Sequence, residues 1–258
     1  MIHGEFDRQA RRTGRIALAM ATVSALLTLD VCEAAATPPM GITRQATADA
    51  VSARVGALFA GGLDGGHFCT ASVVRSGGRD LIATAAHCLN DPGNTVFAPG
   101  YRDGSAPYGV WELTSVYEDP SWDREENPDA DIAFAALAPL DGTRIEDVVG
   151  GFPVAADQPG GVPVTVVGYP STADAPLTCS NDTSMESGTQ RRIGCPDLPG
   201  GTSGSPWLVD GALAGVLGGF EGGGTDPDIS YSAVMGGMAQ DLYRRAAAGD
   251  PVTETPEA

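Results

Sequence analysis

The sequence has no lysine and little positive charge of any kind. Its 258 residues include 15 basic side chains, all of them arginine, against 33 acidic ones, and the formal net charge is −18. A chain this acidic repels phosphate backbones and anionic lipid surfaces, so we expect neither nucleic acid nor a membrane among its partners. There are only three histidines, and no C-x-x-C pair accompanies them. Because zinc sites usually need such clusters, we expect no metal and no cofactor.

Long hydrophobic runs are equally scarce. Residues 16–29 form an apolar stretch that is nearly free of charge, but it is too short for a membrane span. It follows a head with four arginines and precedes Ala34-Ala35-Ala36, which is the pattern of a secretory signal peptide with its cleavage site. We therefore assign residues 1–36 to a signal peptide and expect a secreted, extracellular protein.

Cysteine is rare too, with five in the chain, and Cys32 leaves with the signal peptide. The four that remain are Cys69, Cys88, Cys179 and Cys195. An even number in an exported chain predicts two disulfides, for which three pairings are possible. The sequential pairing closes two short loops and stabilises the fold by about 3 kcal/mol per loop in the chain-entropy model.

Glycine and proline, by contrast, are abundant, at 35 and 19 residues. They separate a series of short apolar runs from Val55 onward, and many brief strands at such spacing predict an all-β barrel or sandwich. Only Met238–Ala248 shows a helical pattern. We expect residues 55–248 to form one domain and the protein to be a monomer. Residues 37–54 predict a leader or short propeptide, and the acidic residues 249–258 predict a disordered tail.

One glycine-rich stretch, Gly201-Thr202-Ser203-Gly204-Ser205-Pro206, carries the residue types of nucleophilic catalysis. A serine hydroxyl is a poor nucleophile unless a base takes its proton and backbone N–H groups hold the oxyanion that forms. The neighbouring glycines let the backbone turn sharply enough to aim the amides of Gly201 and Ser203 at one point. We predict Ser203 as the nucleophile, in preference to Ser205. The alternative is a plain glycine-rich turn between strands.

The base and its supporting acid have few candidates. His87 ends the small apolar run 81–86 beside a cysteine, whereas His67 lies in a glycine-rich turn and is interpreted as structural or as lining a subsite. A catalytic imidazole needs a carboxylate to hold its tautomer. Asp131 opens an apolar strand and is the predicted acid, with Asp129 as the fallback. The acids between 118 and 126 predict a solvated loop, with a calcium site as the weaker alternative.

Residues 55–248 resemble the chymotrypsin-like (trypsin-fold) serine peptidases. The resemblance lies in the order His87, Asp131, Ser203 and in the motifs around these residues. The motifs are Thr84-Ala85-Ala86-His87-Cys88, Asp131-Ile132-Ala133-Phe134 and the serine motif. The resemblance is greatest to compact secreted bacterial members, including the glutamyl-endopeptidase-like group. It implies two six-stranded antiparallel β-barrels, a site in the cleft between them and a C-terminal helix. It also implies His87, Asp131 and Ser203 as the triad, Gly201 and Ser203 as the oxyanion-hole amides, and a disulfide from Cys69 to Cys88.

The chain also departs from the family pattern. The animal enzymes have Gly-Asp-Ser-Gly-Gly-Pro, whose aspartate pairs with a freshly cut N-terminus. Thr202 takes that place here and no Ile-Val-Gly-Gly start lies near Val55, so we expect no activation by that ion pair. Asp197 matches the family position whose acid binds Arg or Lys, which predicts such a residue at P1, just before the cleaved bond; the alternative is a surface turn. Gly218 matches the far pocket wall, where glutamate-selective relatives carry histidine, and so argues against a glutamate preference.

The function that these expectations predict is a secreted serine endopeptidase that hydrolyses proteins or peptides through an acyl-enzyme. Two alternatives remain beside it. One is a catalytically silent homologue that serves as a binding module, and the other is an esterase with the same machinery.

Overall fold

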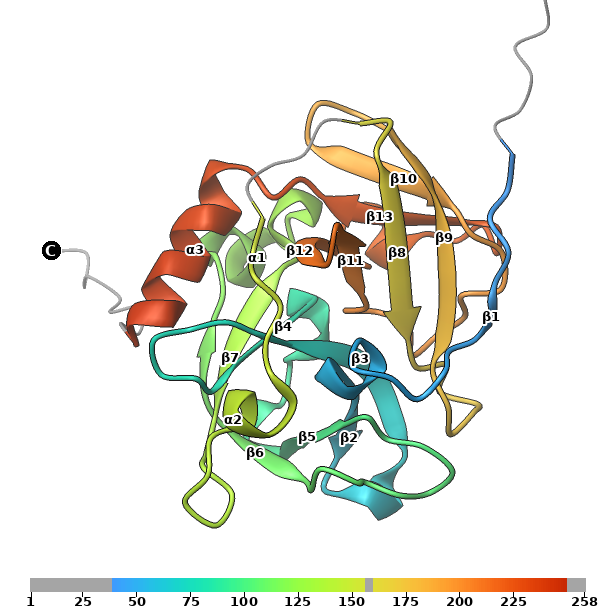
Figure 1. Ribbon diagram of the computed structural model, residues 1–258. Helices are drawn as coiled ribbons and strands as arrows, with labels where there is room; N and C mark the ends of the chain where they lie inside the picture. The colour runs from blue at the N-terminus through green and yellow to red at the C-terminus, as the bar shows by residue number, and fades with distance from the viewer. Residues whose placement is uncertain (1–38, 156–159, 250–258) are drawn as a thin grey trace, which may run out of the picture. The chain divides into compact units, whose positions relative to one another are not determined.

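Six antiparallel strands in the first half of the chain close into a barrel (Figure 1). The structure is a computed structural model that describes residues 39–155 and 160–249. The barrel strands are β2 (Val55–Ala60), β3 (His67–Val74), β4 (Leu81–Thr84), β5 (Thr95–Pro99), β6 (Trp111–Tyr117) and β7 (Ala133–Leu137). They pair in the order β2-β3-β4-β7-β6-β5, and β5 pairs again with β2 to complete the ring.

The interior of this barrel is filled by large buried side chains, and the backbones of β2 and β5 lie close together. A Cβ on Gly56 of β2 would lie 2.4 Å from the carbonyl oxygen of Ala98 on β5, so only glycine fits there. Leu58, Phe97 and Trp111 are fully or almost fully buried around this contact. The short apolar runs of the sequence thus become strands whose inward residues form a packed core.

The second half of the chain forms a curled, seven-stranded sheet. Its strands are β1 (Arg44–Gln45), β8 (Pro163–Gly168), β9 (Leu177–Met185), β10 (Gln190–Gly194), β11 (Pro206–Val209), β12 (Ala212–Val216) and β13 (Ile229–Ala233). The order is β12-β11-β8-β9-β10-β13, with β1 paired to β9.

The two end strands of this sheet, β12 and β13, are joined by isolated hydrogen bonds and do not form a regular β-ladder. The amide of Val216 donates to the Ser232 hydroxyl at 3.1 Å, and the amide of Gly218 donates to the carbonyl of Tyr231 at 3.0 Å. The chymotrypsin-like fold class predicted from the sequence is confirmed, with one closed barrel and a second half-barrel that curls back on itself.

Helices are few in the part of the chain that the structure describes. They are α1 (Pro120–Glu125), α2 (Ile145–Val149) and α3 (Gly237–Ala248), with the short 3-10 turns η1 (Ser52–Arg54), η2 (Leu63–Gly65), η3 (Ala86–Cys88), η4 (Pro92–Asn94), η5 (Pro128–Ala130) and η6 (Phe220–Gly223). The predicted C-terminal helix is confirmed as α3. It buries Ala239, Leu242 and Ala246, and its Tyr243 ring lies 5.6 Å from that of Phe134 on β7.

The segment before the first barrel runs along the second sheet. Gly41 donates its amide to the carbonyl of Gly194 at 2.8 Å, and Arg44 and Gln45 form β1 beside β9. The predicted signal peptide and residues 250–258 of the predicted tail lie outside the described residues. No helix in the described part of the chain is long and apolar enough to cross a membrane.

Candidate active site

Two neighbouring strands of the closed barrel bring a histidine and an aspartate together. His87 lies in η3, directly after β4, and Asp131 lies between η5 and β7. Because β4 and β7 pair, with Thr84 opposite Ala133, the residues that flank these strand ends become neighbours. The Nδ1 atom of His87 lies 2.8 Å from Oδ2 of Asp131.

The Asp131 carboxylate is buried, with 1% of its surface exposed, and its oxygens are well supplied with donors. The backbone amide of His87 donates to Oδ1 at 3.0 Å, and the amide of Gly219 donates to Oδ2 at 2.7 Å. Together with the imidazole these bonds satisfy a carboxylate that would otherwise be costly to bury. They also fix the orientation of the ring of His87.

The fallback acid, Asp129, has a different partner. Its Oδ1 atom accepts a hydrogen bond from Nε2 of Gln190 at 2.8 Å. The same Nε2 donates to the carbonyl of Pro128 at 3.0 Å, while Oε1 of Gln190 accepts from the amide of Phe220 at 3.1 Å. This one buried side chain therefore links η5, which leads into Asp131, to the segment whose Gly219 amide bonds the Asp131 carboxylate.

The serine motif lies against the ends of β3 and β4. The carbonyl of Ser203 accepts from the amide of Thr70 at 2.8 Å. A Cβ on Gly204 would lie 2.1 Å from the Thr70 carbonyl oxygen and 2.2 Å from Oγ1 of Thr84. Since His87 follows β4 directly, this contact brings Ser203 to the edge of the barrel that carries the imidazole. In the described part of the chain, the Ser203 hydroxyl makes no hydrogen bond of its own.

The amides of the serine motif are used unequally. Those of Thr202, Gly204 and Ser205 each donate to a backbone carbonyl, at 3.1, 2.7 and 3.0 Å. Among the described residues, the amides of Gly201 and Ser203 donate to none. Gly201 has a φ of 96°, a conformation that glycine adopts without strain. The two amides predicted to hold an oxyanion are therefore the two that the fold leaves available.

The rival nucleophile, Ser205, is already engaged. It is fully buried, and its hydroxyl donates to the carbonyl of Thr202 at 2.6 Å. A hydroxyl in that position holds the loop and cannot reach a substrate.

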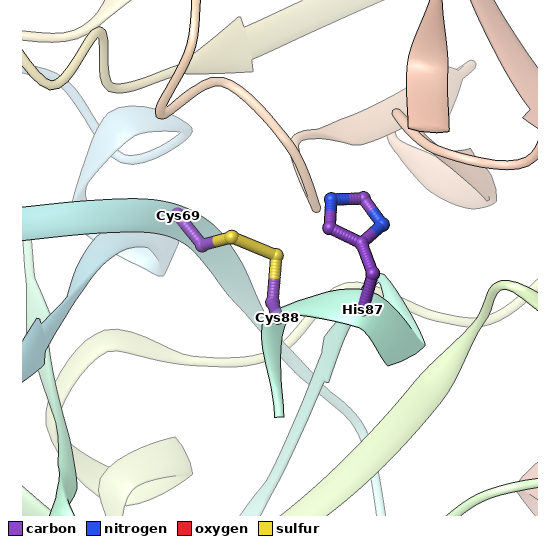
Figure 2. Close-up of side chains that lie close together, drawn as sticks. All are labelled: Cys69, His87 and Cys88. Atoms are coloured by element: carbon purple, nitrogen blue, oxygen red, sulfur yellow. A yellow bond between two sulfur atoms is a disulfide. The ribbon is translucent and has the colours of Figure 1, made fainter. Parts of the chain in front are cut away.

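Both sequential disulfides are present in the structure, Cys69–Cys88 and Cys179–Cys195. Figure 2 shows the Cys69–Cys88 disulfide beside the ring of His87; His87 and Cys88 belong to the same short helix, η3. These two sulfurs and the imidazole form a cluster of metal-ligand types, but the sulfurs are already bonded to each other. The cluster is therefore no metal centre, and the disulfide instead ties η3 to β3.

His67, on β3, packs into an aromatic cluster. Its ring centroid lies 5.4, 5.9 and 6.1 Å from those of Phe59, Tyr101 and Tyr169. Burial lowers the pKa of His67, against the smaller opposing effect of the Asp174 charge. This environment favours the structural interpretation of His67.

The two residues predicted to line the specificity pocket lie in unlike places. Asp197 is exposed, has a φ of 59° and donates its amide to the carbonyl of Pro227 at 3.0 Å. Gly218 packs against the carboxylate of Asp131, where a Cβ would lie 2.7 Å from Oδ2. Glycine at 218 thus leaves room for the buried carboxylate.

Sequence reasoning missed three further residues near the site. Gln190 and Thr70 act through bonds to segments far away in the sequence, and no local pattern marks them. The sequence predicts that Glu118 belongs to a solvated loop, but the structure corrects this, because Glu118 is partly buried. Its burial, and then the charge and hydrogen bond of Asp123, raise its pKa to about 7. On the adjoining helix α1, the ring of Trp122 lies 6.5 Å from that of His87.

The fold is that of a trypsin-like serine endopeptidase, and comparison with known proteins agrees. The family model of the trypsin-like peptidase domain matches residues 69–216, which is more than half of the chain. The chain belongs to the trypsin-like peptidase family. A search of curated proteins gives no match.

Solved structures of proteases resemble the chain over most of its length. Protease Anisep from Arthrobacter nicotinovorans is 27% identical, with a TM-score of 0.70, over 80% of this chain and 99% of that one. The thermostable serine protease AL20, from an extremophilic microorganism, is 30% identical, with a TM-score of 0.68, over 78% and 99%. A Glu endopeptidase, 18% identical with a TM-score of 0.66 over 81% and 98%, shares the fold.

Proposed function

We propose that the chain is a secreted, monomeric serine endopeptidase whose catalytic triad consists of Ser203, His87 and Asp131. The observation that carries the proposal is the buried Asp131 carboxylate bonded to Nδ1 of His87 at 2.8 Å. This bond places a proton on Nδ1 and leaves Nε2 as the basic nitrogen that faces away from Asp131. Secretion rests on the predicted signal peptide and fits a fold with two disulfides.

The chemistry follows from these positions. Oγ of Ser203 attacks the carbonyl carbon of the substrate while its proton passes to Nε2 of His87. The oxyanion that forms receives hydrogen bonds from the amides of Gly201 and Ser203. His87 then gives the proton to the leaving amine, and the C–N bond breaks to leave an acyl-enzyme on Ser203. Water, activated by the same imidazole, hydrolyses this ester and returns the enzyme to its starting state.

The proposed substrates are proteins and peptides, with Arg or Lys at P1. The preference rests on Asp197, whose exposed carboxylate can meet a guanidinium or ammonium group. Digestion of a peptide library, with the cut sites determined by mass spectrometry, tests it directly. Cleavage mainly after Arg and Lys, lost in Asp197→Asn, is the expected result. An unchanged cleavage pattern in that variant contradicts the assignment.

Labelling with a fluorophosphonate tests the nucleophile and separates the proposal from a silent binding module. We expect one adduct per chain, on Ser203, and a fall in turnover on the order of 10⁶-fold in Ser203→Ala. Ser180→Ala is a matched control, because Ser180 is an exposed serine of β9 whose hydroxyl bonds that of Thr165. A wild-type chain that is folded but not labelled, or an adduct on Ser205, refutes the triad. Comparing amide with ester substrates distinguishes an endopeptidase from an esterase.

A further inference from the structure

We propose that Thr70 is a positioning residue that holds the oxyanion loop, residues 200–204, in its active conformation without help from a charged N-terminus. This inference rests on the proposed function, because it assigns a role to the amides of Gly201 and Ser203. It concerns how those amides are aimed, which neither the serine motif nor the family match specifies.

Two peptide groups of the loop fix the direction of the amide of Gly201 and of the following residue. The carbonyl of Gly200 accepts from the amide of Ser171 at 2.9 Å. The carbonyl of Gly201 accepts from the hydroxyl of Thr70 at 3.0 Å. In a trans peptide the N–H points opposite to the C=O of the preceding residue. Holding the Gly200 carbonyl on Ser171 therefore turns the Gly201 N–H to the other side, away from that segment.

The next two peptide groups carry the amides of Ser203 and Gly204. The carbonyl of Thr202 accepts from both the amide and the hydroxyl of Ser205, at 3.0 and 2.6 Å. The carbonyl of Ser203 accepts from the amide of Thr70 at 2.8 Å. Because the Thr202 carbonyl is held by Ser205, the N–H of Ser203 points the opposite way, and the bond of the Ser203 carbonyl fixes the N–H of Gly204 in the same manner. Of four consecutive carbonyls in the oxyanion loop, Thr70 holds two, one through its hydroxyl and one through its amide.

The hydroxyl of Thr70 makes a second hydrogen bond, which connects the oxyanion loop to a neighbouring segment. It accepts from the amide of Tyr169 at 2.8 Å, so that its oxygen is both donor and acceptor. The segment that begins at Tyr169 is the one whose Ser171 amide holds Gly200. Thr70 is completely buried, so water cannot replace either bond. One hydroxyl thus joins the oxyanion loop to the segment beside it.

The side chain of Thr202, in the middle of the loop, carries no charge and so needs no charged partner. Thr202 is buried, with 1% of its surface exposed, and its hydroxyl donates to the carbonyl of Pro199 at 2.7 Å. The side chain therefore closes a bond within its own turn. A free α-amino group has no carboxylate to meet there, and the bonds of Thr70 supply the constraint that an ion pair would otherwise provide.

Thr70→Val tests the hydroxyl, because valine keeps the branched shape of threonine and removes both bonds. We expect kcat to fall about 10- to 100-fold, since the oxyanion donors are misaimed, while KM stays within about twofold. The affinity for a peptide aldehyde, whose hemiacetal oxygen occupies the oxyanion hole, falls by the same factor as kcat. Thr70→Ser keeps the hydroxyl and restores kcat to within about threefold of wild type.

Thr183→Val is the matched control for the loss of a buried hydroxyl. Thr183 lies on β9, is 3% exposed, and its hydroxyl donates to the carbonyl of Val162 at 3.2 Å. We expect this variant to keep the kcat and aldehyde affinity of wild type. A folded Thr70→Val with wild-type kcat and aldehyde affinity overturns the role of Thr70. If that variant does not fold, Thr70→Ser decides, because a large loss of kcat in it contradicts a role for the hydroxyl.

The absence of lysine allows a direct test of the N-terminus. The α-amino group is the only amine in the chain, so an N-hydroxysuccinimide ester acetylates that group alone once hydroxylamine has removed any ester adducts. We expect the acetylated enzyme to keep its kcat to within about twofold. A loss of tenfold or more shows that a charged N-terminus is needed and overturns the proposal. If the wild-type protein takes no fluorophosphonate label, the proposed function is refuted, and the role of Thr70 is refuted with it. If the wild type is labelled but the Thr70 variants give the contradicting results above, only the role of Thr70 is refuted.

Discussion

Replacing Asp131 with asparagine removes the charge beside His87 while keeping the size of the side chain. In the structure Oδ2 receives the imidazole at 2.8 Å and the Gly219 amide at 2.7 Å, and Oδ1 receives the His87 amide at 3.0 Å. Asparagine offers one oxygen and one NH₂ group. In one orientation the NH₂ group faces the amide of Gly219 and forces Nδ1 to accept, so that Nε2 carries the proton and cannot act as a base. In the other it faces the amide of His87, donor against donor.

The loss of charge adds to this mismatch whichever orientation forms. With charge centres about 4 Å apart and an effective dielectric constant of about 20, a carboxylate stabilises an imidazolium by about 4 kcal/mol. Because 1.36 kcal/mol corresponds to a factor of ten, this interaction is worth roughly a thousandfold in rate. The wrong tautomer raises the expected loss of kcat to about 10⁴-fold.

The assay is hydrolysis of a small ester or peptide substrate under saturating conditions, with the reactivity of Ser203 toward a fluorophosphonate as a second readout. Asp129→Asn is the matched control, since Asp129 lies two residues away and bonds Gln190 in place of His87. We expect that variant to stay within about fivefold of wild type. If Asp131→Asn keeps kcat within tenfold, or if Asp129→Asn is the more damaging of the two, the reasoning is refuted.

Three further predictions concern stability and positioning. Gln190→Leu breaks the link between η5 and the segment of Phe220, so we expect kcat to fall about tenfold and the free energy of unfolding to fall by about 1–3 kcal/mol, because buried partners lose their hydrogen bonds; equal kcat refutes the link. The double change Cys179→Ser and Cys195→Ser should lower the free energy of unfolding by about 3 kcal/mol, measured in urea, and equal midpoints contradict this. Glu118, with its pKa raised from 4.5 to about 7, binds an extra proton in the folded state between these values. The free energy of unfolding should therefore fall as pH rises through this window, and Glu118→Gln should flatten that slope, whereas an identical pH profile refutes the assignment.

Much of the architecture could be predicted because short stretches of neighbouring residues determine it. Short apolar runs between glycine and proline gave the strands, and the spacing around Leu242 gave the C-terminal helix, which the structure confirms. The cysteine count limited the disulfides to three pairings, and the sequential one is present. These features depend on neighbours in the sequence, so a single chain is enough to predict them.

What could not be predicted depends on register between distant segments. Thr70 lies 131 positions before Gly201, the residue whose carbonyl it holds, and no local pattern indicates that bond. Gln190 meets Asp129 across 61 positions. Glu118 is partly buried and interacts with Asp123 of α1, which no local pattern indicates, so the sequence groups it with exposed acids instead. The triad assignment and the P1 preference remain predictions that the experiments above test.

The segment that precedes the closed barrel has a consequence for maturation. β1 pairs with Leu177 and Thr178 at the end of β9 that β10 does not reach, and a Cβ on Gly41 would lie only 2.6 Å from the sulfur of Cys179. A processing cut after residue 46 would strip this cover, exposing an open strand edge and the disulfide to reductants and to other chains. A cut before Pro39 leaves both sealed. Where a leader is removed, the position of the cut therefore decides how well the enzyme withstands reducing surroundings and self-association.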